Sequence, residues 1–171
     1  MAFYYKLEGP AKSAYDKMQT GLEGIARKEL KLKDPKSIVT RELRPEDVGL
    51  STPEWTFNVT PAAAWFTMVN NQSISDNRFV GINGIFYPKS TDQAVSQIKI
   101  TREGQDVRYW PIQGINYQEN LAVYFDDPII VKQNTPITIE GYAVSTGATE
   151  KICFLGLVAE KEGLLVQSGR L

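Results

Sequence analysis

The stretch Leu121–Glu160 constrains the fold more than any other part of the sequence. β-branched and aromatic residues dominate it, and short segments containing Pro, Asn or Gly interrupt it at 126–128, 134–136 and 145–147. The stretch therefore predicts three or four consecutive strands. The run Thr135–Ala143 has the alternation of a strand with one buried face: Ile137, Ile139, Gly141 and Ala143 lie opposite Thr138, Glu140 and Tyr142.

The alternation of strand and turn extends upstream to Trp55. It gives about eight strands in all, at the spacing expected of sandwiches and barrels. No helical segment alternates with these strands, which disfavours parallel α/β folds. A turn is expected at 88–92, and polar loops at 70–77 and 111–120. The upstream strands are predicted at Trp55–Val59, Ala64–Val69, Arg78–Tyr87, Val95–Thr101 and Val107–Ile112.

Two all-β architectures fit this number and spacing of strands, an immunoglobulin-like sandwich and an eight-stranded jelly roll. Cys153 is the single cysteine of the sequence, so the disulfide of an immunoglobulin domain cannot form. The strand number and the two long loops favour the jelly roll. We therefore predict an all-β fold: an eight-stranded antiparallel jelly-roll or β-sandwich domain at 51–171, preceded by an N-terminal helical arm and connector at 1–50.

In the arm, apolar residues recur at helical spacing over Pro10–Leu32, which predicts an amphipathic helix. A short strand is expected after it, at Ser37–Leu43. Proline at the start suits a first helical turn. Three positions for the apolar stripe of this amphipathic helix are open: on one end or face of the barrel, on a neighbouring subunit, or on a membrane surface near the basic residues between 27 and 36. The stripe consists of Ala11, Tyr15, Met18, Leu22 and Ile25.

The amino-acid counts disfavour several classes of function. The sequence contains no histidine, which removes Ser-His-Asp and Cys-His catalytic systems and histidine metal sites. The net charge of -1 argues against specific nucleic-acid binding, and no apolar run has the length of a transmembrane helix. We predict no enzymatic activity, no catalytic residues, no metal site and no cofactor. A glycosidase that uses two carboxylates is the enzymatic alternative.

Aromatic residues are the remaining candidates for binding. Trp55 shares a strand face with Phe57 and is expected in the core. The segment Arg108-Tyr109-Trp110 ends the predicted hairpin and is expected to contact a partner or ligand, because Trp, Tyr and Arg are enriched at interfaces. Together with the helical stripe, this gives a predicted interface that comprises Tyr15, Met18, Leu22, Ile25, Arg108, Tyr109 and Trp110.

The closing strands of the sequence resemble those of single jelly-roll virion proteins. The residues that carry the resemblance are FDDPIIVKQNTPITIEGYAV followed by ATEKICFLGLVAE, within a span of Trp55–Glu160. In particular, they resemble small capsid proteins of bacterial and archaeal icosahedral viruses built from vertical single β-barrels. The resemblance implies a virion location and a structural coat subunit. Such a subunit would assemble with copies of itself, or with a larger coat protein, over an internal membrane.

A second function is compatible with the same architecture. A β-sandwich can present aromatic residues and loops to a carbohydrate or receptor, as a module of a virion spike or of a cell-surface assembly. Loss of glycan binding on substitution of Trp110 would favour this alternative over the coat subunit.

Overall fold

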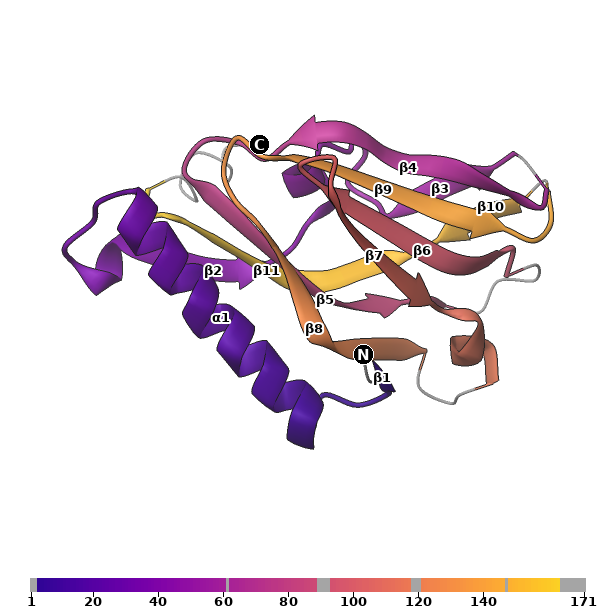
Figure 1. The fold of residues 1–171 in the computed structure, drawn as a ribbon, viewed down its shortest axis with the longest axis horizontal. Coiled ribbons are helices and arrows are strands. Elements are labelled where there is room, and N and C mark those ends of the chain that lie inside the picture. The colour runs from indigo at the N-terminus through magenta and orange to yellow at the C-terminus, as the bar shows by residue number, and fades with distance from the viewer. Residues whose placement is uncertain (1–2, 61, 89–92, 118–120, 147, 164–171) are drawn as a thin grey trace.

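The computed structural model has three antiparallel sheets and one N-terminal α-helix (Figure 1). It describes residues 3–60, 62–88, 93–117, 121–146 and 148–163. Most strands belong to two larger sheets, and their inner faces enclose a shared hydrophobic core, in a β-sandwich-like arrangement. The mostly β composition confirms the predicted fold class at this level. Positions 89–92 of the predicted turn, and 164–171 of the predicted domain, lie outside the described residues.

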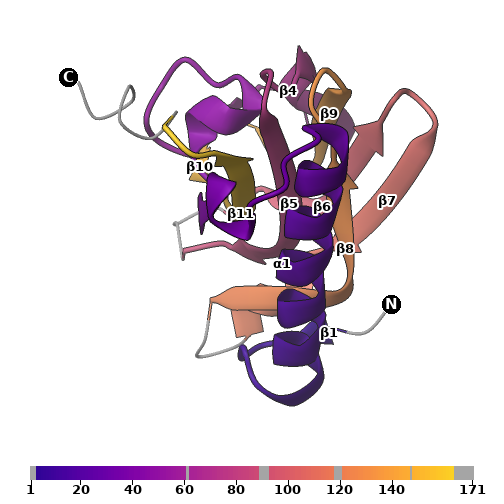
Figure 2. The ribbon, with the colours of Figure 1, turned by 90° about the vertical axis from the view of Figure 1, so that its left-hand side faces the viewer.

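The helix α1 spans Gly9–Glu29. Pro10 lies in its first turn, and the chain turns away after Leu30, where Lys31 adopts a positive φ of 54°. The helix packs on β8, β5, β11 and β2, so it covers the outer face of one sheet (Figure 2). This contact confirms the first of the three predicted positions. The buried positions of the helix are Ala11, Ala14, Met18, Leu22 and Ala26.

The sheet under α1 has five strands in the order β1-β8-β5-β11-β2. Two of them come from the first fifty residues, so the predicted arm contributes strands to the sheet instead of only preceding it. In particular, β2 pairs with β11 from Ile38 to Glu42. The strands are β1 (Phe3–Tyr4), β2 (Ile38–Glu42), β5 (Arg78–Phe86), β8 (Ala122–Val131) and β11 (Cys153–Lys161).

The second large sheet has four strands in the order β4-β9-β6-β7. They are β4 (Ala64–Ser73), β6 (Val95–Arg102), β7 (Asp106–Pro111) and β9 (Pro136–Ala143). The predicted alternation in β9 is confirmed, because its buried residues are Ile137, Ile139, Gly141 and Ala143. The third sheet pairs β3 (Thr56–Val59) with β10 (Ala148–Lys151). Short 3-10 helices lie at Pro35–Ser37 (η1), Pro45–Val48 (η2) and Gln113–Tyr117 (η3).

Two predicted breaks are wrong. The segment 126–128 was expected to separate two strands, but β8 continues through it. Four residues of β8, 125–128, lie opposite the single residue Asn83 of β5, and this wide bulge accommodates Pro128 without ending the strand. The predicted loop at 70–77 is also shorter, because β4 continues to Ser73 with two register shifts against β9. From Trp55 onward the described residues contain nine strands, β3 to β11, where the sequence predicted about eight.

Candidate functional site

An aromatic cluster lies on the outer face of the four-stranded sheet. Trp65 of β4 stands directly across from Tyr142 of β9, and the ring centroids are 5.4 Å apart. Tyr109 of β7 packs edge-on against Trp65 with a centroid separation of 6.0 Å. The side chain of Tyr109 is 51% exposed, so one ring of the cluster faces solvent. Such exposed rings can stack on flat apolar surfaces of a ligand or partner.

Charged groups hold this cluster in place. The Nζ atom of Lys99 lies 5.0 Å from the centre of the Trp65 ring, within the range of a cation–π interaction. Lys99 also forms an ion pair with Glu140, its neighbour across β6 and β9. The result is an amphipathic face, with aromatic rings beside one neutralised pair of charges.

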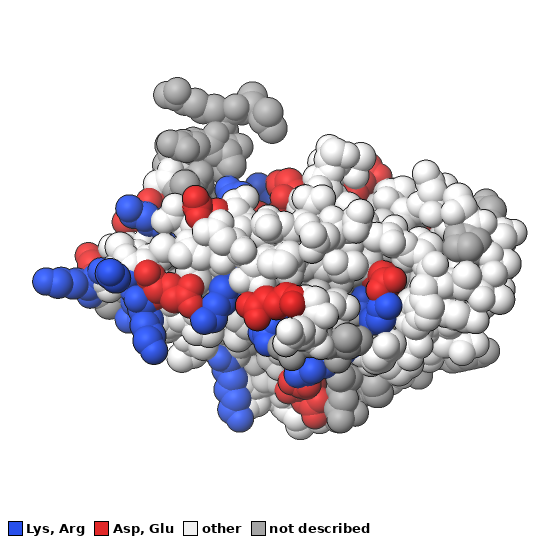
Figure 3. All heavy atoms as spheres, turned by 45° about the horizontal axis from the view of Figure 1, so that its top comes forward, with Lys and Arg blue, Asp and Glu red and all other residues white. Residues whose placement is uncertain are grey.

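The surface around β4 carries few charges. The strand has no acidic or basic residue between Ala64 and Ser73. Figure 3 shows a largely uncharged area over β4, whereas Lys and Arg side chains gather toward the end at which α1 finishes. The strand lies at the edge of its sheet, with β9 as its one neighbour in the sheet order. An uncharged edge of this kind favours contact with another molecule over repulsion.

The predicted interface residues fall into two groups. Met18 and Leu22 are buried under α1, and Trp110 is stacked on Phe125 in the core, with ring centroids 4.1 Å apart. These three side chains therefore make intramolecular contacts. The remaining four retain exposed surface, and their role in an interface stays a prediction: Tyr15, Ile25, Arg108 and Tyr109. Trp55 is half-buried and packs edge-on against Phe154, partly as expected of a core residue.

Sequence reasoning missed the contribution of Tyr142 and Lys99 to the aromatic cluster. Both lie on strands that were predicted, and both alternate with buried residues. Their partner Trp65 is more than thirty residues from either in the chain. Only the pairing of β4 with β9 and of β9 with β6 brings the three together.

Tyr87 and Glu150 form a buried hydrogen-bonded pair at the main hydrophobic core. The Tyr87 hydroxyl donates a hydrogen bond of 2.8 Å to Glu150, and the backbone N–H of Ala94 donates one of 3.0 Å to the same carboxylate. Both side chains are 0% exposed. Burial, followed by the hydrogen bond to Glu150, raises the pKa of the Tyr87 phenol well above its ordinary range. The phenol therefore stays protonated and acts as a fixed donor, which suits a structural role.

Two partly exposed arginines, Arg41 and Arg78, pair with two buried carboxylates, Asp47 and Glu160. Arg41 of β2 donates two hydrogen bonds of 2.7 Å to Asp47, and two of 3.0 and 3.3 Å to Glu160. Arg78 of β5 donates one of 2.9 Å to Glu160. Both carboxylate side chains are 0% exposed. Their bonds to Asp47 and then to Glu160 hold the pKa of Arg41 above its ordinary value despite burial. We refer to these four residues as the buried ion quartet.

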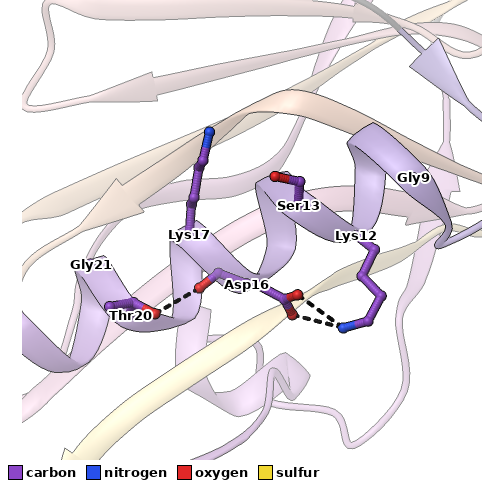
Figure 4. Close-up of a pocket in the computed structure, with 7 residues that line it drawn as sticks. All are labelled: Gly9, Lys12, Ser13, Asp16, Lys17, Thr20 and Gly21. Carbon is purple, nitrogen blue, oxygen red and sulfur yellow. Dashed lines mark hydrogen bonds and ion pairs between the residues drawn. The ribbon is translucent and has the colours of Figure 1, made fainter.

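An open hollow lies along the exposed side of α1 (Figure 4). Two side-chain interactions within the helix lie there: Lys12 pairs with Asp16 at 2.9 Å, and the Thr20 hydroxyl donates to the backbone oxygen of Asp16. All of its lining residues belong to this one helix, so no opposite wall encloses a ligand: Gly9, Lys12, Ser13, Asp16, Lys17, Thr20 and Gly21.

No arrangement for metal binding emerges from the part of the chain that the structure describes, since no three His, Cys, Asp or Glu side chains cluster there. Burial raises the pKa of the half-buried Cys153 thiol, which lowers its reactivity at neutral pH. Within the same residues, none of the helices has the length and apolar character needed to cross a bilayer.

Comparisons with known proteins add no assignment to this geometry. No protein-family model matches the chain, and no curated protein matches its sequence.

Proposed function

We propose that this protein is a jelly-roll coat subunit of a virus particle, whose function is to assemble with copies of itself or with a larger coat protein. The observation that carries the proposal is the order of the strand pairs. Five antiparallel pairs are nested in the chain: β6 with β7, β5 with β8, β4 with β9, β3 with β10, and β2 with β11. The pairs of β5 with β11 and of β6 with β9 join these nested pairs side by side into the two larger sheets. A single long hairpin that wraps into two facing sheets pairs its strands in this order, as a jelly roll does.

The step from fold to function rests on analogy. Jelly rolls recur in virus capsids, in lectins and in cupins. The metal sites of cupin-like barrels are rich in histidine, and this sequence contains none. The resemblance of the closing strands to single jelly-roll virion proteins favours the capsid among the remaining functions.

The edge strand β4 is the contact that we propose for assembly. It is ten residues long and uncharged, and its far end from Asn70 to Ser73 is exposed. An edge strand presents backbone N–H and C=O groups that a second molecule can pair with, and edge lysines are a common means of preventing such pairing. Standard interfaces bury about 1,200–2,000 Å² in total, an area that a face of this sheet can supply together with its loops.

The oligomeric mass tests this function. We expect the purified protein to form dimers or larger assemblies in light scattering at high concentration, and regular oligomers or shells in electron microscopy. The variant Asn70→Lys should shift the population toward the monomer, because it places a charge on β4. The matched control is Asn58→Lys, on the exposed side of β3, and it should assemble like the wild type. A protein that stays monomeric at all concentrations would contradict the proposal.

A second candidate function is favoured by the exposed aromatic cluster. Tyr109, with Trp65 and Tyr142 behind it, offers a ring for stacking on a sugar, as in carbohydrate-binding β-sandwich modules. We expect a carbohydrate-binding protein of this kind to lose its glycan-array signal in the variant Tyr109→Ala. The control Val144→Ala removes an equally exposed apolar side chain, 52% against 51%, and should retain the signal. Trp110 is unsuited to this test because it is a core residue. Absence of glycan signal in the wild type would exclude this candidate.

A further inference from the structure

Lysine and arginine side chains gather at the end of the molecule where α1 finishes (Figure 3). Five of them lie within ten residues of the chain, in the last turn of the helix and in the segment that leads to β2. Lys161 belongs to the same end, because it pairs with Ile38 at the start of β2, and the next backbone N–H donates a hydrogen bond to the backbone oxygen of Ser37. We refer to these six residues as the basic end: Arg27, Lys28, Lys31, Lys33, Lys36 and Lys161.

The cations of the basic end are not neutralised by neighbouring carboxylates. None of the six forms an ion pair with another residue of the described chain, whereas most described lysines and arginines elsewhere do. Glu29 pairs instead with Lys132, at 2.6 Å. The other carboxylates of this end are Asp34 and Glu162, so four positive charges remain in excess. The whole chain has a net charge of -1, so the rest of it carries -5 and the charge is one-sided.

Interactions within the protein do not account for this cluster. Arg27 and Lys28 lie in the last turn of α1, where the helix dipole favours positive charge. That effect falls off beyond the terminal turn, and the other four cations follow the helix or belong to β11. The five lysines are exposed, and Arg27 is half-buried. Like charges repel one another, so an anionic partner would stabilise this end.

We propose that the basic end is a contact surface for a lipid bilayer with anionic headgroups. Clusters of about four to eight Lys and Arg side chains on an amphipathic helix are typical of segments that bind anionic lipids. The apolar stripe of α1 is buried on the sheet, so the contact is formed by the charges beyond the helix. The proposal is independent of the coat function, because β4 is not part of this surface and binding to a bilayer does not require assembly.

The composition of the basic end favours lipid over nucleic acid. Five of its six cations are lysines, whereas the bidentate contacts that read bases and phosphates favour arginine. The sequence from Ile25 to Ile38 contains no aromatic residue on which a base could stack. Leu32 lies between Lys31 and Lys33, is half-buried, and is not among the described residues that pack on the hydrophobic cluster under α1. Its side chain can therefore enter the boundary between headgroups and acyl chains.

Co-sedimentation of the full chain with lipid vesicles tests the proposal. We expect binding to phosphatidylcholine vesicles in which phosphatidylserine replaces about a third of the lipid, and no binding to pure phosphatidylcholine. Binding should weaken as the salt concentration rises, because salt screens exposed charges. Absence of binding to the anionic vesicles, or equal binding to both kinds, would overturn the proposal. Binding to a DNA duplex without binding to vesicles would identify nucleic acid as the partner and would also overturn it.

Two double variants with the same change in net charge locate the contact. Lys33→Glu/Lys36→Glu should weaken binding to the anionic vesicles by about thirtyfold or more, because two attractions become repulsions. The matched control is Lys6→Glu/Lys17→Glu, which reverses two other exposed lysines that form no ion pair with a described residue. Lys17 precedes Arg27 by ten residues of helix, about 15 Å, which exceeds the Debye length of about 8 Å at physiological salt.

The control variant should therefore retain vesicle binding within about threefold of the wild type. All four substituted lysines are exposed, so both variants should unfold at the temperature of the wild type in circular dichroism. Equal losses of binding in the two variants would show that total charge, and not the basic end, governs the interaction. That result would overturn the proposal.

Discussion

Replacement of Arg41 by methionine is expected to destabilise the folded protein by about 3–5 kcal/mol, the usual cost of removing one partner from a buried ion pair. Arg41 bonds to both carboxylates of the buried ion quartet, and both are 0% exposed. Without it, Asp47 and Glu160 would remain buried beside one another. Arg78 would be their nearest cation, at 2.9 Å from Glu160 and 3.8 Å from Asp47. Urea unfolding followed by circular dichroism measures the change in the free energy of unfolding.

The matched control for this substitution is Arg108→Met. Arg108 also forms a close ion pair, with Asp127 at 3.0 Å, but the two side chains are 40% and 51% exposed. Solvent screens an exposed pair, and such pairs contribute at most about 1 kcal/mol. Equal losses in the two variants would contradict the view that burial of the carboxylates sets the cost.

The elements that the sequence predicted well are those specified by local pattern. The period of α1 identified the buried positions Ala11, Met18 and Leu22, because side chains three and four apart share one face of a helix. The alternation in β9 identified its buried face for the same kind of reason. Both elements have one clear apolar side, so their sequence patterns contain the information that packing uses.

The breaks at 70–77 and 126–128 were misjudged because tertiary pairing overrides local preference. Asp126, Asp127 and Pro128 favour a turn when considered alone. In the fold, β8 has β5 on one side, and pairing resumes at Ile129 opposite Ile82 after the bulge. The backbone hydrogen bonds between β8 and β5 on both sides of the bulge keep the strand intact. The local sequence of β8 does not predict these hydrogen bonds.

The candidate site depends on non-local pairing in the same way. Tyr109 and Trp110 are adjacent, so they point to opposite faces of β7, and the sequence does not say which face is buried. The register of β7 against β6 decides it, because Trp110 lies across from the buried Ile98, and Tyr109 across from Lys99.

Substitution of Gly156 by alanine is expected to destabilise the protein by about 3 kcal/mol or more, at the upper end of the cost of overpacking. A Cβ atom at this position would lie 1.9 Å from the backbone oxygen of Gly81 and 3.0 Å from the Cα of Ile82. These are backbone atoms of β5, so no side-chain rotation can relieve the contact, and the strands β11 and β5 would have to separate at the bulge. Urea unfolding measures the loss.

The control is Gly24→Ala in α1, where an added Cβ meets no atom within 4 Å. This variant should stabilise the protein by about 0.5–1 kcal/mol, because alanine has a higher helix propensity than glycine. The same chemical change is thus expected to act in opposite directions at two glycines of one chain. If Gly156→Ala were tolerated as well as Gly24→Ala, the close approach of β11 to β5 would be wrong. The bulge at Asn83 would then be wrong with it, since both depend on the same register shift between Leu155 and Gly156.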